Sequence, residues 1–347
     1  MSRPYVLRYV CLVATVLALS ACQNERIQRY QSFVFGTLVE VKIRAKDREA
    51  ADTASSRLFA KFDELHSTWH AWKPGALADV NRQLSSGQWF TPPASILPLL
   101  IKSKQWFKDS DELFNPAIGG LIALWGFHAD ELPLHPPEVE QIDAFLQELP
   151  DMDDVQIEST RVRSLNPRLS IDLGGMAKGY AIEIGMQLLH EQGISNALIN
   201  AGGDLCGSGS RGDRPWRIGI RHPLRQGVLA SVDLADGECV FTSGDYERGY
   251  DFQGKHYHHI IDPRNGYPAN QVVSATVIHP DGALADAAST ALLIAGPDGW
   301  RKVARQMDVQ DVLLVDRNGR LYMTPSMQAR IRLEKTDSHG RSIHSAT

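Results

Sequence analysis

The chain carries the segment Leu169-Ser-Ile-Asp-Leu-Gly-Gly-Met-Ala-Lys-Gly-Tyr180 near its middle. The pattern predicts a short apolar strand that ends at Asp172, a turn at the glycine pair, and an amphipathic helix over residues 180–191. Glycines let a ligand approach the backbone, and a helix N-terminus offers free N–H groups beside the positive charge of Lys178. The segment is compatible with phosphate binding, although it lacks the Walker and G-x-G-x-x-G patterns. On spacing alone, the simpler interpretation is a tight turn that packs a helix onto a sheet.

Alternating and helical patterns on both sides predict a chain that mixes helices and strands. A hairpin is expected over residues 29–44 and a helix over 47–69. A second helix, 92–108, is expected to bury Leu97, Leu100, Ile101 and Phe107. The remaining expected elements are strands over 197–205, 216–221, 230–234, 239–245, 256–262 and 272–279, a helix over 283–294, and a terminal hairpin, 312–323, with a type I′ turn at Asn318-Gly319.

The N-terminus indicates export. Two arginines precede an apolar run over residues 10–19, and Leu19-Ser-Ala-Cys22 is similar to a bacterial lipobox. The run is too short to cross a bilayer as a permanent helix. We expect residues 1–21 to be a signal peptide, Cys22 to carry the lipid, residues 22–28 to form a tether and 29–333 to fold. The charged, Ser/His-rich tail, 334–347, is expected to be disordered.

Composition sets bounds on the class of protein. The 347 residues are 43% hydrophobic and 22% charged, with a net charge of −5. These are ordinary globular values, and nothing in the charge predicts nucleic-acid binding. Beyond the signal region the cysteines are Cys206 and Cys239. They could pair in an oxidising compartment, but two buried free thiols are the preferred expectation.

Two oxygen donors recur at helical spacing in the expected helix 283–294. Asp286 and Thr290 are four residues apart and share one face, with Ser289 beside them. A carboxylate and a hydroxyl can hold Mg²⁺, which keeps waters or phosphates as its other ligands. The alternative is structural, with Asp286 near a helix start and Thr290 at the edge of the core.

A pair of histidines, His258 and His259, lies in the expected strand 256–262. Adjacent strand residues point to opposite faces, so only one of the two can face a site, and they are not a metal pair. That histidine would suit a general base, because its pKa lies near neutrality. A hydrogen-bonded structural histidine is the alternative. The hydroxyl-rich Thr242-Ser-Gly-Asp245 could likewise bind a ligand or merely close a strand.

Together these motifs resemble the ApbE family, the FAD:protein FMN transferases. The matching segments run in order through the chain: Phe35-Gly-Thr37, Trp69, Asp79-Val-Asn-Arg82, Asn115-Pro116, Leu124-Trp-Gly-Phe127, Asp172-Leu-Gly-Gly-Met-Ala-Lys-Gly179, Asn200-Ala-Gly-Gly-Asp204, Thr242-Ser-Gly-Asp245, His259-Ile-Ile-Asp-Pro263 and Asp286-Ala-Ala-Ser-Thr290. The resemblance implies an α+β fold of two layers, with mainly antiparallel sheets, flanking helices and a site between two halves.

The resemblance also implies an activity. Family members bind FAD and Mg²⁺ and transfer FMN to a Thr or Ser hydroxyl of a target protein, releasing AMP. By position, His259 would be the base. The residues that contact FAD would be Phe35, Trp69, Leu124, Trp125, Asp172, Lys178 and Ile260. Mg²⁺ would be held by Asp286 and Thr290, with a backbone carbonyl of Ala177 or Gly175 and Ser289 as an additional ligand.

Two other functions stay open. One is Mg²⁺-dependent hydrolysis of FAD to FMN and AMP, and the other is a lipid-anchored carrier of FAD without enzymatic activity. The partners expected from the resemblance are FAD and a subunit of a membrane redox complex. The expected location is the periplasmic side of the inner membrane, through the lipid anchor.

Overall fold

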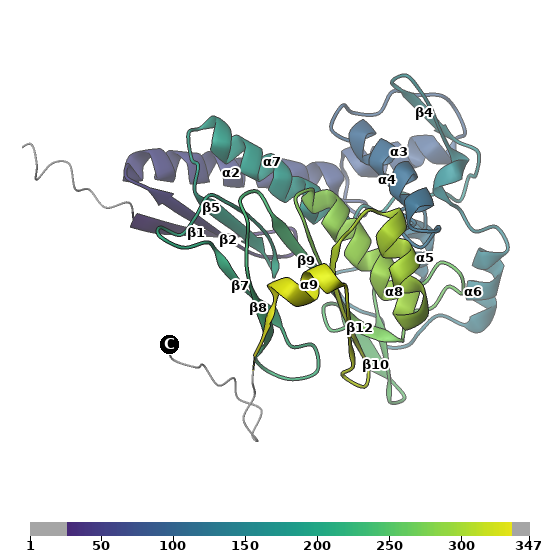
Figure 1. Cartoon of the computed structure of the whole chain (residues 1–347). Helices are drawn as coiled ribbons and strands as arrows, with labels where there is room; N and C mark the ends of the chain where they lie inside the picture. Colours follow the sequence, from purple (N-terminus) through teal and green to yellow (C-terminus); the bar gives the residue numbers. More distant parts are fainter. Residues whose placement is uncertain (1–25, 335–347) are drawn as a thin grey trace, which may run out of the picture.

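A computed structural model describes residues 26–334 of the chain. Its centre is an eight-stranded sheet in which all neighbouring strands are antiparallel (Figure 1). In spatial order the strands are β1 (Arg26–Val34), β2 (Thr37–Ala45), β5 (Ala197–Ala201), β6 (Asp204–Ser208), β9 (Cys239–Gly244), β12 (Val272–His279), β13 (Asp311–Asp316) and β14 (Leu321–Met323).

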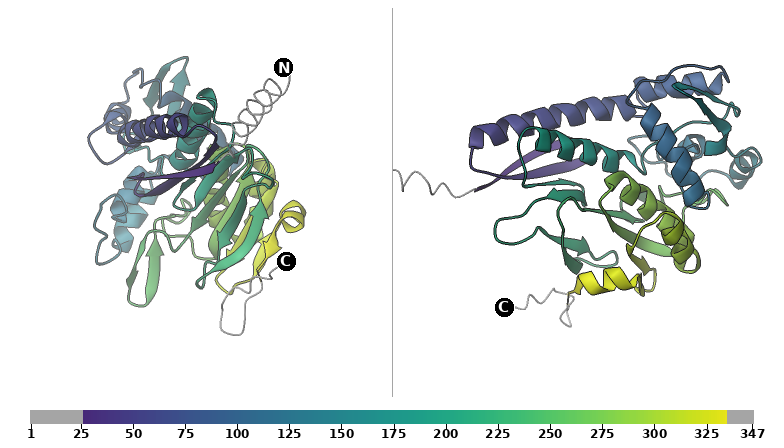
Figure 2. Two further views of the ribbon diagram at one scale, coloured as in Figure 1. Left: turned by 90° about the vertical axis from the view of Figure 1, so that its left-hand side faces the viewer. Right: turned by 45° about the horizontal axis from the view of Figure 1, so that its top comes forward.

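Three long helices cover one face of this sheet: α2 (Arg48–Trp69), α7 (Ala177–Glu191) and α8 (Gly282–Gln306). Figure 2 shows α2 and α7 lying side by side above the strands. Asp47 caps α2 by accepting from the N–H groups of Glu49 and Ala50. The buried side chains of α2 recur at a spacing of three or four, which gives the helix one apolar face. Helix α8 is interrupted at Gly296, where φ is 70°, so its straight first segment matches the predicted helix 283–294.

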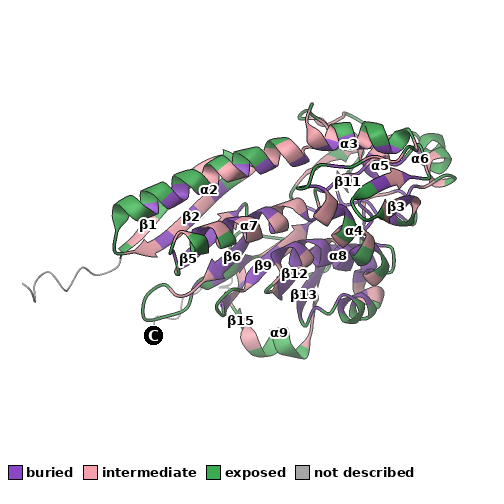
Figure 3. Cartoon of the chain, turned by 90° about the horizontal axis from the view of Figure 1, so that it is seen from above, coloured by how far each residue is buried: buried purple, intermediate pink, exposed green. Residues whose placement is uncertain are grey.

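The other face of the sheet is covered in part by a second sheet. This sheet contains β7 (Arg217–Arg221), β8 (Val228–Asp233) and β15 (Arg332–Leu333), and α9 (Pro325–Arg330) lies next to it. Leu198 packs towards this sheet and its neighbour Ile199 towards the helices, as the two-residue period of a strand requires. The two faces of the main sheet therefore carry separate hydrophobic clusters, and Figure 3 shows the inner strands and much of α8 as buried.

The remaining elements form a lobe at one end of the main sheet. They are α3 (Ala76–Ser85), α4 (Leu97–Asp109), α5 (Gly119–Leu124), α6 (Val139–Leu146), a 3-10 turn (Met152–Asp154), β3 (Val155–Glu158), β4 (Arg161–Ser164), β10 (Gly249–Phe252) and β11 (Lys255–His258). The lobe has a hydrophobic cluster of its own around Trp125 and Phe127. Within the described range, no helix is long and apolar enough to cross a membrane.

The predicted mixed fold with mainly antiparallel sheets and flanking helices is confirmed, and the β7–β8–β15 sheet adds a partial third layer. Residues 26–28, expected in a tether, belong to β1. Ile101 is 50% exposed rather than buried. The last hairpin has its left-handed residue at Gly319 alone, because its loop is one residue longer than a type I′ turn. The predicted signal peptide and Cys22 lie outside the described residues, as does all of the predicted tail except residue 334.

The expectation of two free thiols is wrong, because Cys206 and Cys239 form a disulfide. The two cysteines are directly opposed on β6 and β9, with their Cα atoms 4.0 Å apart. They are separated by 33 residues in sequence, and the register that opposes them is set by the sheet. Spacing alone could not predict this pairing.

Candidate active site

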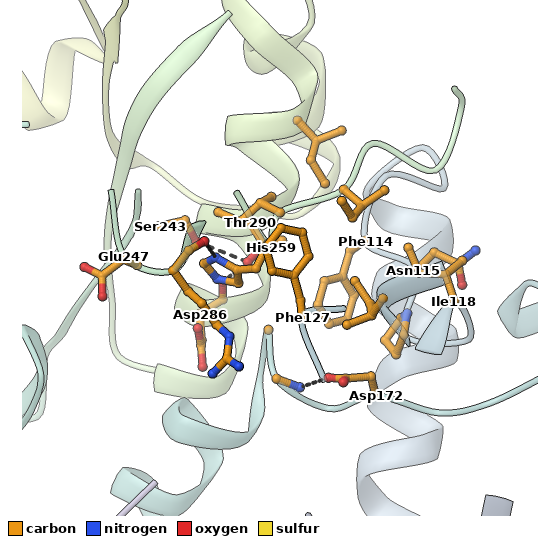
Figure 4. A pocket seen from close by; sticks show the side chains of 18 of the residues that line it. Phe114, Asn115, Ile118, Phe127, Asp172, Ser243, Glu247, His259, Asp286 and Thr290 are labelled. Atoms are coloured by element: carbon orange, nitrogen blue, oxygen red, sulfur yellow. Dashed lines mark hydrogen bonds between the residues drawn. The ribbon is translucent and has the colours of Figure 1, made fainter. Parts of the chain in front are cut away.

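A cavity of about 280 Å³ lies where the main sheet meets the lobe (Figure 4). The turn before α7, the first half of α8 and the ends of β6 and β9 form one wall. The second wall comes from residues around α5 and from the segment after β11. Hence segments that are far apart in sequence converge on one space.

The first wall holds a buried group of charges. Lys178 forms an ion pair with Asp204, and the other carboxylate oxygen of Asp204 accepts from the Thr242 N–H at 2.9 Å. Burial alone would lower the pKa of Lys178, but the carboxylates of Asp204 and Asp286 outweigh burial and raise it. Lys178 therefore stays charged and supplies a fixed positive charge to the cavity.

Asp286 holds the start of α7. Its Oδ2 accepts from the N–H of Gly179 at 3.0 Å, one of the first-turn amides that lack a partner inside the helix. This N–H is thereby directed away from the Gly175 carbonyl, four residues earlier. Burial raises the pKa of the Asp286 carboxyl to about 7, and the charge of Asp204 adds to the effect. A second positive charge beside Asp286 would offset the free-energy cost of burying its charged carboxylate.

Three hydroxyl groups form a hydrogen-bonded cluster next to the backbone carbonyl of Asp286. Ser243 Oγ lies 2.8 Å from Ser289 Oγ and 3.1 Å from Thr290 Oγ1. Thr290 and Ser243 line the cavity. Ser289 is 1% exposed, and its hydroxyl donates to the Asp286 carbonyl at 2.8 Å, so it faces the helix and Ser243 rather than the open space.

The donor set fits a hard cation such as Mg²⁺. It combines a buried carboxylate with a threonine hydroxyl, and Gly175 lies against that hydroxyl: a Cβ placed on Gly175 would be 3.4 Å from Thr290 Oγ1. Ala177 is the first residue of α7 and borders a neighbouring cavity. Within residues 26–334 no group of three His, Cys, Asp or Glu side chains could hold a metal. A Mg²⁺ ion bound here would complete its coordination with waters or substrate oxygens, as Mg²⁺ commonly does.

His259 faces the cavity, whereas His258 is fully buried and bonds the Ala269 carbonyl. The prediction that only one of the two histidines can face a site is confirmed. His259 Nδ1 lies 3.2 Å from the Arg248 carbonyl oxygen, which can only accept, so Nδ1 carries the proton and Nε2 has a free lone pair. Burial lowers the pKa of His259 to about 4, with a smaller effect from His258. The imidazole is therefore neutral at neutral pH.

The opening segment, residues 169–180, borders two cavities. Asp172 and Lys178 line the central cavity and also a second one of about 590 Å³, which Phe35 and Trp69 line as well. The Asp172 carboxylate is held by the Trp72 indole N–H at 3.0 Å and the Gly174 N–H at 2.7 Å. The two cavities thus share one polar edge, along which an extended ligand could lie.

The second wall of the central cavity is apolar. Phe114, Ile118, Phe127 and Ile260 line it. Leu124 and Trp125 do not line either cavity: Trp125 is completely buried behind Phe127, where its Nε1–H donates to the Gly266 carbonyl at 2.7 Å. Trp125 therefore supports the wall instead of forming its surface.

The structure brings together most of the predicted residues and adds others. Phe127, Asp204, Ser243 and Arg248 also line the cavity. The available signal for Asp204 was an acid after a glycine pair at a strand end, and for Ser243 a hydroxyl-rich turn. No sequence pattern pointed to Arg248, because its position depends on how the lobe packs against the main sheet. Arg248 Nε and Trp69 Nε1 are buried donors without a partner in the described chain, and both residues border the cavities.

Fold and site together define an α+β protein with a cavity between a charged wall and an apolar wall. In a comparison with known proteins, the model of the ApbE family matches residues 35–314. The chain belongs to the ApbE family.

The relatives have consistent names. An FAD:protein FMN transferase of Rhodobacter capsulatus is 42% identical over 303 residues, which is 86% of this chain and 57% of that protein's length. One from Escherichia coli K12 is 32% identical over 285 residues, 79% of each chain. The crystal structure of the ApbE protein of Thermotoga maritima has a TM-score of 0.81 at 30% identity, covering 88% of this chain and 100% of that one. The apo structure of Pseudomonas stutzeri flavinyl transferase ApbE gives 0.77 at 26% identity, covering 88% and 97%.

Proposed function

We propose that this chain is an FAD:protein FMN transferase, which moves FMN from FAD onto a Thr or Ser hydroxyl of a target protein and releases AMP. The observation that carries the proposal is the convergence of three groups on one cavity. These are a neutral histidine with a free Nε2, a buried carboxylate beside a threonine hydroxyl, and a lysine held by acids. The names of the family relatives support it.

FAD would lie along the edge shared by the two cavities. Its ring systems would contact the apolar wall of the central cavity and the aromatic side chains Phe35 and Trp69. Its pyrophosphate would lie at the N-terminus of α7, beside Lys178 and Arg248. The unpartnered Arg248 Nε would then find an acceptor.

Asp286 and Thr290 would hold Mg²⁺, with the Gly175 carbonyl as a backbone candidate, because Gly175 lies next to Thr290. A Mg²⁺ ion held by these residues would supply positive charge that offsets the negative charge of the pyrophosphate and of the leaving AMP. Ser289 would act indirectly, by fixing Ser243 and the Asp286 carbonyl.

His259 would accept the proton of the incoming hydroxyl at Nε2. The hydroxyl oxygen bonds to the FMN phosphorus, the bond from that phosphorus to the AMP oxygen breaks, and AMP leaves. The product is a phosphoester between FMN and the target. The apolar wall would exclude water, which otherwise competes for the same phosphorus.

The location and the target are part of the proposal. The lipobox-like Leu19-Ser-Ala-Cys22 supports a lipid anchor at Cys22 and a place on the periplasmic side of the inner membrane. A membrane redox complex with a subunit exposed on that side is the target expected of the family. Labelling Cys22 with a lipid precursor and fractionating membranes tests the anchor.

One assay tests the activity. Purified protein is incubated with FAD, Mg²⁺ and an acceptor protein that bears a flavinylation motif. Equal amounts of AMP and acceptor-bound flavin support the transferase. AMP with free FMN and an unlabelled acceptor would instead identify a hydrolase, and bound FAD without AMP would identify a carrier. Replacing Mg²⁺ with a chelator should abolish AMP release.

A further inference from the structure

The disulfide lies at the shortest pairing of the main sheet. The register between β6 and β9 consists of two residue pairs, Leu205 with Val240 and Cys206 with Cys239. The neighbouring pairings of β5 with β6 and of β9 with β12 extend over five and six residue pairs. Just before β9, the Gly207 N–H donates to the Glu238 carbonyl and the Gly207 carbonyl accepts from the Gly237 N–H, which continues the contact. The covalent link therefore strengthens the shortest strand pairing of the main sheet.

The same two strands enter the active site. Asp204 lies two residues before Cys206, and Thr242 and Ser243 lie three and four residues after Cys239. At the site, the strands are joined by the hydrogen bond from the Thr242 N–H to Asp204. The position of Asp204, which holds Lys178, thus depends on how β6 and β9 are held together.

The disulfide also supports the start of α8. A Cβ on Gly282, the first residue of α8, would lie 3.1 Å from each sulfur atom, so the helix rests directly on the bond. Gly282 in turn lies against Gly179 of α7, where an added Cβ would be 2.7 Å from Ala283 Cα. One turn beyond Gly282, Asp286 accepts the Gly179 N–H.

We propose that the Cys206–Cys239 disulfide positions Asp286. It does so by fixing how closely α8 approaches α7 at the contact between Gly282 and Gly179. The disulfide does not touch the cavity and acts through α8, so the two cysteines are positioning residues. Without the bond, the pairing of β6 with β9 loosens, the contact of Gly282 with the two sulfur atoms is lost, and the Asp286–Gly179 hydrogen bond weakens. The part of the inference that concerns Mg²⁺ rests on the proposed function, while the part that concerns the hydrogen bond does not.

The bond can be removed in two ways. The double variant Cys206→Ala/Cys239→Ala removes it genetically. A phosphine reductant removes it from the unaltered protein. A further cavity, of about 300 Å³ and lined by both cysteines with Glu183 and His190, gives a small reagent room to approach the bond. Gly282→Ala is an independent probe, because it keeps the disulfide but crowds the contact between α8 and the two sulfur atoms. Val232→Ala, in the smaller sheet, is the matched control for a general loss of stability.

The first readout is amide hydrogen exchange in the metal-free protein. The ratio of the amide exchange rate of Gly179 to that of Leu314 in β13 should rise about tenfold in the double variant, in the reduced protein and in Gly282→Ala. Loss of a hydrogen bond worth about 1.4 kcal/mol corresponds to a tenfold change. Val232→Ala should leave the ratio unchanged. The reductant should have no effect on the double variant.

The second readout is the Mg²⁺ concentration that gives half-maximal AMP release. It should rise about tenfold in the same three proteins, with kcat at saturating Mg²⁺ changed by less than about threefold. An unchanged Gly179 ratio in the reduced protein and in Gly282→Ala would overturn the inference. Absence of AMP from the unaltered protein would instead overturn the proposed function, and the exchange readout would still decide the role of the disulfide.

Discussion

The two walls of the central cavity are built by different means. The charged wall consists of side chains that hold one another: Lys178 with Asp204, Asp286 with the start of α7, and Ser243 with Thr290. The apolar wall consists of Phe114, Ile118, Phe127 and Ile260, with Trp125 packed behind Phe127. The charged wall depends on single hydrogen bonds between distant segments, whereas the apolar wall depends on packed area.

Because the walls differ in this way, substitutions in them should have different kinetic effects. Removing a charge or donor from the first wall should reduce the chemical step, because interactions at the reacting atoms are stronger in the transition state. Trimming the second wall should mainly weaken ligand binding, because contact area is used equally before and during the reaction. The substitutions below test that separation, in order of decreasing effect.

Asp286→Asn should have the largest effect. Asparagine can still accept the Gly179 N–H, but it lacks the negative charge that would hold Mg²⁺. We expect AMP release to fall about 10³-fold, equivalent to roughly 4 kcal/mol. Thermal unfolding of the metal-free variant should show no loss of stability, since a costly buried charge has been removed. Near-normal turnover in a folded variant would contradict the role of Asp286.

His259→Ala should lower FMN transfer about 10²-fold or more, the range typical of a general base. His256→Ala is the matched control: His256 is in β11, three residues earlier, and does not line the cavity. It should keep activity within about threefold. Equal losses in the two variants would show that the effect of His259→Ala comes from the packing of this segment.

The same histidine should affect stability in acid. Burial lowers the pKa values of His258 and His259 to about 4, below the value of about 6.5 expected in the unfolded chain. Between these values the unfolded state binds more protons, so the free energy of unfolding should decrease as pH falls from about 6.5 towards 4. Urea unfolding at about pH 7 and about pH 5 should show a smaller decrease for His259→Ala than for the unaltered protein. Identical decreases would show that His259 is not held neutral.

Phe127→Ala tests the apolar wall. Phe127 is 5% exposed and lines both cavities, so the variant loses contact area that FAD would cover. We expect KM for FAD to rise about tenfold with a smaller change in kcat. Phe127→Leu, which keeps most of the apolar surface, should restore most of the affinity. A loss confined to kcat would place Phe127 with the catalytic groups instead.

Ser289→Ala should have the smallest effect, a change of less than about threefold in the Mg²⁺ concentration needed for activity. Its hydroxyl is turned to the Asp286 carbonyl and to Ser243 rather than into the cavity. Thr290→Val, which removes a hydroxyl that does face the cavity, should have a larger effect. The reverse order would make Ser289 a direct ligand.

The sequence predicted the parts of this site that depend on local pattern. The turn after Asp172, the single histidine facing the site and the shared helical face of Asp286 and Thr290 all follow from neighbouring residues. The assignment of roles came from the resemblance to a family and not from spacing. The signal peptide and the lipid anchor stay predictions.

The rest depends on contacts between distant segments. The pairing of Cys206 with Cys239 follows from the register of β6 and β9. The inward direction of Trp125 follows from the aromatic cluster of the lobe, where it packs against Tyr257 and Tyr267. The place of Arg248 follows from the way the lobe meets the main sheet. No pattern within one segment carries this information.

We propose that a protein hydroxyl, activated by His259, attacks the FMN phosphorus of FAD directly. The most direct test is to run the reaction with an acceptor protein in water enriched in ¹⁸O, followed by mass spectrometry of the flavinylated acceptor and of AMP. We predict no ¹⁸O in the phosphate of the acceptor-bound FMN and one AMP for each FMN attached. Incorporation of ¹⁸O into that phosphate, or AMP formed with free ¹⁸O-labelled FMN and no flavinylated acceptor, would contradict it.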